Sequence, residues 1–152
     1  GTLAAACALA ARDAGLPLSF QLLIYPGTCA HQDTASHFAY ADGYLLGRET
    51  ILWFFDQYIG TPADRDDWRF APLNAPTLAG LAPAWVGLAE FDALVDEGVD
   101  YARKLQAAGV PTELRLYAGM VHTFFNMGGF VRAATRAHDD AVAALRRIWG
   151  LD

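Results

Sequence analysis

A chain of 152 residues is long enough for one domain with a buried core, and a hydrophobic fraction of 54% excludes a disordered chain. The formal charge of −6 is spread without acidic or basic runs, and only one lysine stands among the 11 basic residues, so we expect neither a nucleic-acid partner nor a polybasic membrane patch. The longest apolar runs are far shorter than the roughly 20 residues of a membrane span. We therefore expect a cytoplasmic protein with no membrane span.

The chain begins within a helical pattern. Leu3, Cys7, Ala10 and Ala14 recur at steps of four, three and four, which makes one apolar stripe on a helix. We expect this stripe to be buried, with Cys7 as a small hydrophobic side chain rather than part of a disulfide framework or zinc site. Only two residues precede the stripe, so the usual capping segment ahead of a first helix is missing.

Three short apolar runs bounded by Gly and Pro predict strands. They are residues 18–26 (LSFQLLIYP), 83–91 (PAWVGLAEF) and 112–119 (TELRLYAG). The first two are almost continuously hydrophobic, which is typical of strands in a sheet that is covered on both faces. The third alternates more.

Helical patterns separate and follow these strands. A short aromatic stripe occupies residues 51–58, after Gly47, and is most simply a core face. Two longer stripes occupy residues 99–108 and 134–148. Asp96 and Gly109 are suitable caps for the middle helix. Strands that alternate with helices predict an α/β fold, with a mainly parallel sheet in a three-layer αβα arrangement.

The predicted sheet has an open edge. Only about three strands are visible, and a sheet of this size leaves the apolar edge of residues 18–25 bare, which favours aggregation. We therefore expect something to cover that edge. The candidates are an N-terminal half that this sequence lacks, another chain, or a second copy in a homodimer.

Two titratable residues follow neighbouring strands. Asp92 stands directly after the second strand, and His122 stands a few residues after the third. The carboxyl ends of parallel strands meet at one edge of the sheet, where such sheets gather their active sites. An Asp that holds one imidazole nitrogen fixes the tautomer, so that the other nitrogen can act as a base. The pair therefore predicts two members of a nucleophilic hydrolase site whose nucleophile is missing.

Each of these residues has a simpler alternative. His122 alone could be an ordinary loop histidine, and Asp92 could cap the following helix. Asp96 is better placed for that cap, so we favour Asp92 as the partner of His122 and treat Asp96 and Glu97 as structural acids. Glu90 is interpreted as a supporting hydrogen-bond acceptor or a rim charge. The remaining histidines lack metal-ligand spacing, and we expect surface or capping roles for them and no metal: His31, His37 and His138.

Several motifs, in this order, resemble the hormone-sensitive-lipase-like (bacterial group IV) esterases, a family of α/β-hydrolases. Residues 92–98 (DALVDEG) are similar to the family's acidic motif D-P-L-x-D-E-G, and residues 122–124 (HTF) to its histidine motif H-G-F. Residues 2–15 (TLAAACALAARDAG) resemble the helix that follows the nucleophile motif G-D-S-A-G-G. Ala93 and Thr123 replace the usual Pro and Gly, and neither departure removes a reacting group. The likeness extends over essentially the whole chain.

The resemblance implies a partial α/β-hydrolase fold. Residues 1–152 would be the C-terminal part of a single domain, with residues 28–80 as an insertion or pocket-lining segment. Gly1 would end the nucleophile elbow, with the catalytic Ser roughly three positions upstream and the oxyanion loop further back. It further implies a carboxylic-ester hydrolase for short- to medium-chain acyl esters, which acts by Ser-His-Asp acyl transfer through Asp92 and His122 with no metal or organic cofactor.

Candidates for the substrate pocket follow from nearness to these two residues. They are Leu94, Val121 and Phe124, and Trp53, which lies off the aromatic stripe, is a fourth. The aromatic helix of residues 51–59 is itself either core or part of an acyl pocket, and its helical spacing favours core. Two other functions stay open: a non-catalytic or split hydrolase that binds a partner chain, and an amide or carbamate hydrolase of the same family. Because the segment carries no nucleophile, we expect residues 1–152 alone to have no triad-based esterase activity.

Overall fold

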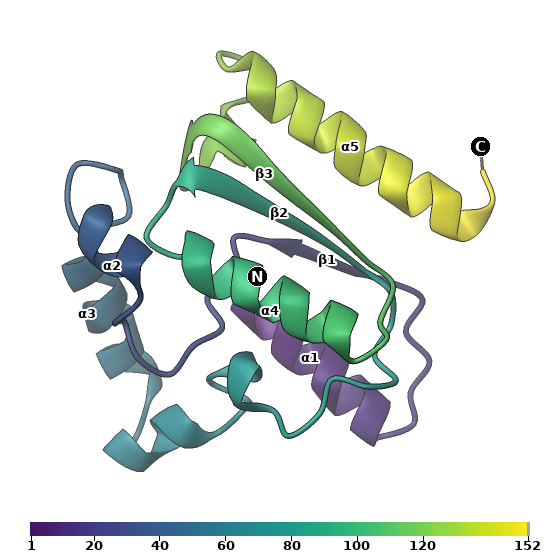
Figure 1. The fold of residues 1–152 in the computed structure, drawn as a ribbon, viewed down its shortest axis with the longest axis horizontal. Helices are drawn as coiled ribbons and strands as arrows, with labels where there is room; N and C mark the ends of the chain where they lie inside the picture. The colour runs from purple at the N-terminus through teal and green to yellow at the C-terminus, as the bar shows by residue number, and fades with distance from the viewer. Residues whose placement is uncertain (152) are drawn as a thin grey trace.

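A sheet of three parallel strands forms the centre of the computed structural model, which describes residues 1–151 (Figure 1). β1 (Gln21–Ile24), β2 (Ala84–Phe91) and β3 (Thr112–Val121) pair in the order β1-β2-β3. Leu23 lies opposite Val86, and Val86 lies opposite Leu114. The predicted parallel sheet is confirmed.

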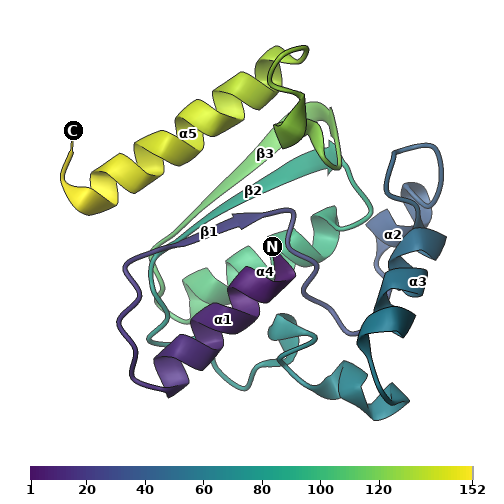
Figure 2. The same ribbon diagram turned by 180° about the vertical axis from the view of Figure 1, so that it is seen from behind.

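Helices cover both faces of this sheet (Figures 1 and 2). α1 (Thr2–Asp13) and α4 (Val95–Ala107) pack on one face, and α5 (Arg132–Trp149) packs on the other. Alternate side chains of β2 serve the two resulting cores: Val86 and Leu88 join α1 and α4, whereas Trp85 and Ala89 join α5. Because both faces are buried, β2 is hydrophobic along nearly its whole length. The predicted three-layer αβα arrangement is confirmed.

The segment between β1 and β2 first passes beyond the C-terminal ends of the strands and then runs back past α1 and α4 to the start of β2 (Figure 1). It holds α2 (Ala35–Ala39), α3 (Arg48–Tyr58) and two short 3-10 helices, η1 (Pro62–Asp66) and η2 (Pro72–Asn74). α3 begins after Gly47, as predicted, and packs through Ile51 against Ala93 and Leu94, which follow β2. α2 and α3 therefore cover the edge of the sheet where the candidate residues are expected.

The predicted buried stripe on the first helix is wrong. Leu3 is 61% exposed, and Cys7, Ala10 and Ala14 are exposed as well. The face of α1 that meets the sheet carries Ala5, Ala8 and Leu9 instead. Because α1 consists mostly of alanine and leucine, several helical stripes are equally apolar, and local periodicity could not select the buried one.

Two further details differ from the prediction. α4 begins at Val95, so Asp96 lies within its first turn and does not cap it; the predicted end is confirmed, because Gly109 follows with a φ of +77°. The aromatic stripe of α3 is core only at Ile51, whereas Phe54 and Tyr58 are more than half exposed. Helical spacing shows which side chains share a face of α3 but not how much of that face is covered. In the structure, α3 packs on the buried clusters only through Ile51 and Phe55.

Candidate active site

The structure brings Asp92 and His122 into contact at the C-terminal edge of the sheet. The last paired residues of β2 and β3 are Phe91 and Val121, so each candidate is the first residue after its strand. The distance between Asp92 Oδ2 and His122 Nδ1 is 2.7 Å. The Asp92 side chain is 2% exposed and that of His122 is 21% exposed, so the carboxylate is enclosed while the imidazole reaches the surface.

The surroundings of Asp92 fix the roles of the two imidazole nitrogens. Asp92 Oδ1 accepts a hydrogen bond from the Leu94 backbone N–H at 3.0 Å. An ionised carboxylate can only accept hydrogen bonds, so the bond to Oδ2 places a proton on His122 Nδ1. His122 Nε2 then carries the free lone pair in the neutral imidazole. The arrangement can therefore take up a proton at Nε2 and stabilise the resulting imidazolium.

The first residue of the chain packs against the same edge of the sheet. A Cβ added to Gly1 would lie 2.4 Å from the Pro26 Cα atom and 2.7 Å from the Ile24 carbonyl oxygen, at the end of β1. Only glycine fits at such a close approach of two backbones. α1 starts at the next residue and runs back under the sheet. A residue just ahead of Gly1 would therefore enter at the edge that carries Asp92 and His122.

The four predicted pocket residues lie in different surroundings. Leu94 is buried with Ile51 under α3, and Val121 is partly buried at the end of β3. The Phe124 side chain is 1% exposed in the core between the sheet and α5, so it has no free surface for a substrate. Trp53 is 59% exposed on α3.

An apolar cavity lies at the start of α1. Its volume is about 230 Å³, and its walls come from α1, α3 and the segment before η2: Thr2, Leu3, Phe54, Phe55, Tyr58 and Phe70. Thr2 and Leu3 directly follow Gly1, which packs against the end of β1, so the cavity lies near that end of the strand. The aromatic residues of α3 were the available signal: the sequence leaves core and acyl pocket as alternatives for this helix, and its helical spacing favours core.

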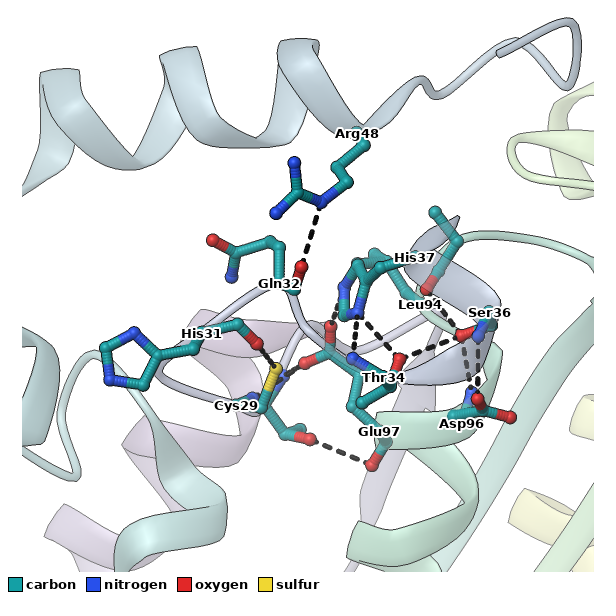
Figure 3. A network of polar contacts seen from close by, with 12 residues as sticks. Cys29, His31, Gln32, Thr34, Ser36, His37, Arg48, Leu94, Asp96 and Glu97 are labelled. Atoms are coloured by element: carbon teal, nitrogen blue, oxygen red, sulfur yellow. Dashed lines mark hydrogen bonds and ion pairs between the residues drawn. The ribbon is translucent and has the colours of Figure 1, made fainter. Parts of the chain in front are cut away.

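Glu97 is the centre of a buried network of polar contacts that joins α4 to the loop after β1 and to His37 of α2 (Figure 3). Its fully buried carboxylate accepts hydrogen bonds from the backbone N–H groups of Thr28 and, at 2.7 Å, Cys29. Its second oxygen lies 3.1 Å from His37 Nε2. His37 is fully buried and forms a capping box with Thr34 at the start of α2, so its predicted capping role is confirmed. Glu97 therefore acts structurally, by fixing the loop after β1 to α4.

The same network contains the one group of side chains, among the described residues, whose donor atoms could together hold a metal ion. One donor atom from each of Cys29, His37 and Glu97 lies within 4.8 Å of the others. Two of these side chains already make hydrogen bonds: Glu97 Oε2 accepts two backbone N–H groups, and the Cys29 thiol donates to the His31 carbonyl. His37 Nε2 faces Glu97 Oε1 at 3.1 Å. Burial and the nearby Glu97 charge also raise the pKa of the Cys29 thiol, which keeps it protonated and a poor metal ligand.

Asp96 and His138 have structural roles as well. The Asp96 carboxylate accepts a hydrogen bond from the Ser36 backbone N–H at 2.8 Å, in the first turn of α2. The exposed His138 ring packs against Phe125 at a centroid distance of 4.7 Å.

Within the part of the chain that the structure describes, no helix has the length and hydropathy that crossing a lipid bilayer requires.

Comparison with known proteins identifies relatives that share this fold. Residues 1–126 match a family described as having the alpha/beta hydrolase fold. The chain is 42% identical over 127 residues to the ethyl acetate hydrolase of Pseudomonas putida, covering 84% of this chain and 40% of that protein. It is 41% identical over 152 residues to a carboxylesterase of Mycobacterium tuberculosis, covering 97% of this chain and 47% of that protein.

A solved structure extends this likeness to three dimensions. A fungal esterase from Rhizomucor miehei superposes with a TM-score of 0.94 at 37% identity, over 99% of this chain and 47% of that chain. The chain therefore spans about half the length of the relatives it matches. With this identity, this coverage and the parallel αβα sheet, the chain belongs to the α/β-hydrolase family, in its hormone-sensitive-lipase-like group of esterases.

Proposed function

We propose that this chain is the acid–base half of a carboxylic-ester hydrolase that works by acyl transfer. The observation that carries the proposal is the 2.7 Å hydrogen bond between Asp92 and His122 at the C-terminal edge of a parallel sheet. The ethyl acetate hydrolase and carboxylesterase names of the relatives support the choice of ester substrates. No step requires a metal or an organic cofactor.

The mechanism assigns one task to each residue. A serine placed about three positions before Gly1 attacks the acyl carbon, while His122 Nε2 takes the serine proton. Asp92 stabilises the imidazolium through the bond to Nδ1. His122 then donates the proton to the departing alkoxide, and a water molecule activated in the same way releases the acid. Backbone N–H groups from outside residues 1–152 would hold the oxyanion.

The apolar cavity beside α1 is the proposed acyl site. Its volume of about 230 Å³ is small for a ligand pocket, which typically measures about 300–1,000 Å³. A cavity of this size suits a short- to medium-chain acyl group. Its lining residues Leu3 and Phe54 expose mainly apolar atoms, so no charged substrate group is favoured there.

We further propose that a second segment completes the domain, of which residues 1–152 form the C-terminal part. Among the described residues, β1 pairs only with β2 and leaves its other edge free. α1 packs beside β1 and exposes the apolar side chains of Leu3 and Cys7. A preceding segment, another chain or a second copy would cover both surfaces.

A complementation assay tests the proposal. Residues 1–152 are produced alone and joined to a segment that supplies the motif G-D-S-A-G and the oxyanion loop, and both are assayed with p-nitrophenyl acetate. We expect no acyl-enzyme burst from the chain alone and a stoichiometric burst from the completed protein. In the completed protein, His122→Ala and Asp92→Asn should lower kcat by about 10³–10⁴-fold. His31→Ala, which changes an exposed histidine outside the pair, is the matched control.

Two results would contradict the proposal. One is a burst from residues 1–152 alone that His122→Ala abolishes, since it would place a nucleophile within the chain. The other is a folded, active completed protein whose rate His122→Ala leaves unchanged. The corresponding p-nitroanilide, assayed in parallel, distinguishes an amidase from an esterase.

A further inference from the structure

The backbone around His122 departs from regular strand geometry. Between β2 and β3 the register shifts: Ala89 lies opposite Tyr117, but Phe91 lies opposite Val121. Three residues of β3 therefore face one of β2, which forms a bulge directly before His122. Gly119, inside the bulge, has a φ of +74°, and Thr123, just after His122, has a φ of +72°. Such a backbone path needs specific support, because it interrupts the strand pairing on the way to the candidate base.

Glu90 supports the bulge from the neighbouring strand. It is the single residue of β2 that faces the extra residues of β3, and its Oε2 accepts a hydrogen bond from the Gly119 backbone N–H at 2.7 Å. A carboxylate therefore replaces the carbonyl acceptor that the shifted register no longer supplies. Glu90 also lies two residues before Asp92 on the same strand, so it fixes β3 relative to the element that carries the partner of His122.

Tyr25 supports the other side of His122. Its hydroxyl oxygen accepts a hydrogen bond from the Phe125 backbone N–H at 2.7 Å, three residues after His122. Its ring also contacts the imidazole, with centroids 4.7 Å apart. Tyr25 stands just after β1 with a φ of +42°, a conformation that is unfavourable for a non-glycine residue and that marks a position held by its surroundings.

From these contacts we infer that Glu90 and Tyr25 are positioning residues that clamp the backbone on either side of His122. The inference rests on the proposed function, because it explains how Nδ1 is kept at Asp92. Glu90 fixes Gly119 ahead of the imidazole and Tyr25 fixes Phe125 behind it. The clamp draws on β1, β2 and β3 together, so it ties the candidate base to all three strands of the sheet.

A proton-exchange measurement tests the clamp on the chain itself, without any need for activity. In ¹⁵N-labelled residues 1–152, the His122 Nδ1 proton is identified by its loss in His122→Gln, and its exchange with water is measured well below the unfolding midpoint of each variant. Tyr25→Phe keeps the ring but removes the acceptor for the Phe125 N–H. We expect exchange to accelerate about fivefold to tenfold, which corresponds to the loss of one hydrogen bond of about 1 kcal/mol. Tyr117→Phe, which removes a hydroxyl bonded to Asp140 on α5, is the matched control and should leave the rate within about twofold.

A second pair of variants tests the other side of the clamp. Glu90→Ala should accelerate the exchange by a similar factor, and Glu90→Gln, which keeps an oxygen acceptor, should restore most of the protection. Glu113→Ala removes a carboxylate near the opposite end of β3 and is the control. If Tyr25→Phe and Glu90→Ala lower the unfolding midpoint but leave the His122 Nδ1 proton as protected as in the wild type, the clamp is refuted and both residues are merely structural. A wild-type chain without a protected Nδ1 proton would instead refute the Asp92–His122 pairing, and the clamp with it.

Discussion

Removal of the Glu97 carboxylate should destabilise this chain more than the loss of any exposed acid. In Glu97→Ala, the backbone N–H groups of Thr28 and Cys29 lose their acceptor in a buried site, and His37 loses the carboxylate 3.1 Å from its Nε2. A buried donor without an acceptor costs about 1–3 kcal/mol, so the two backbone N–H groups together account for about 2–6 kcal/mol. The two groups of contacts share one side chain, so we expect a total loss near the middle of this range, about 3–5 kcal/mol.

Thermal unfolding followed by circular dichroism measures this loss. For a chain of this size, 1 kcal/mol corresponds to a shift in Tm of about 2–4 °C, so Glu97→Ala should lower the Tm by roughly 6–20 °C. Glu97→Gln keeps one oxygen acceptor and should cost less. Glu49→Ala, which removes an exposed carboxylate in the first turn of α3, is the control and should cost under about 1 kcal/mol. A Glu97→Ala variant that unfolds within about 2 °C of the wild type would refute the reasoning that this carboxylate satisfies buried N–H groups.

The remaining predictions concern the two thiols and one glycine. Cys7 is exposed, whereas burial and the charge of Glu97 raise the pKa of the Cys29 thiol, so at pH 8 the folded chain should react with one equivalent of a disulfide reagent and the denatured chain with two. Rapid titration of two thiols in the folded state would contradict this. A Cβ at Gly87 would lie 2.4 Å from ring atoms of the buried Trp85, so Gly87→Ala should cost about 1–3 kcal/mol in urea denaturation; an unchanged midpoint would show that the ring can move aside.

The juxtaposition of Asp92 and His122 could be predicted from the sequence because it depends on topology alone. Once two strands are recognised as parallel neighbours, the residues that follow them must meet at one edge of the sheet. The exact path could not be predicted. β3 alternates as one continuous strand in the sequence, and the bulge at Gly119 emerges only from its pairing with β2. The sequence therefore predicts Glu90 only as a supporting hydrogen-bond acceptor, and its partner, the Gly119 N–H in the bulge, could not be predicted.

Local patterns failed where the chain offers several equivalent choices or where partners are distant. α1 is so rich in alanine that more than one face could be buried, and packing on the sheet selects Ala5, Ala8 and Leu9. Glu97 was recognised as a structural acid, but its partner Thr28 lies 69 residues earlier in the chain, beyond the reach of any helical or strand periodicity. The cavity beside α1 has the same origin, since its walls come from three separate segments.

Three carboxylates between the end of β2 and the first turn of α4 have three different partners. Asp92 contacts His122, Asp96 holds the first turn of α2 through the Ser36 N–H, and Glu97 holds the loop after β1. All three side chains project from the junction of β2 and α4, so α2, the loop after β1 and the candidate base are fixed to one rigid element. A change at Asp96 or Glu97 should therefore alter the position of α2 and of the loop after β1 relative to the site, whereas a change at Asp92 acts on the imidazole directly. For this reason the spacing of the three acids, and not only their number, has physical meaning in this motif.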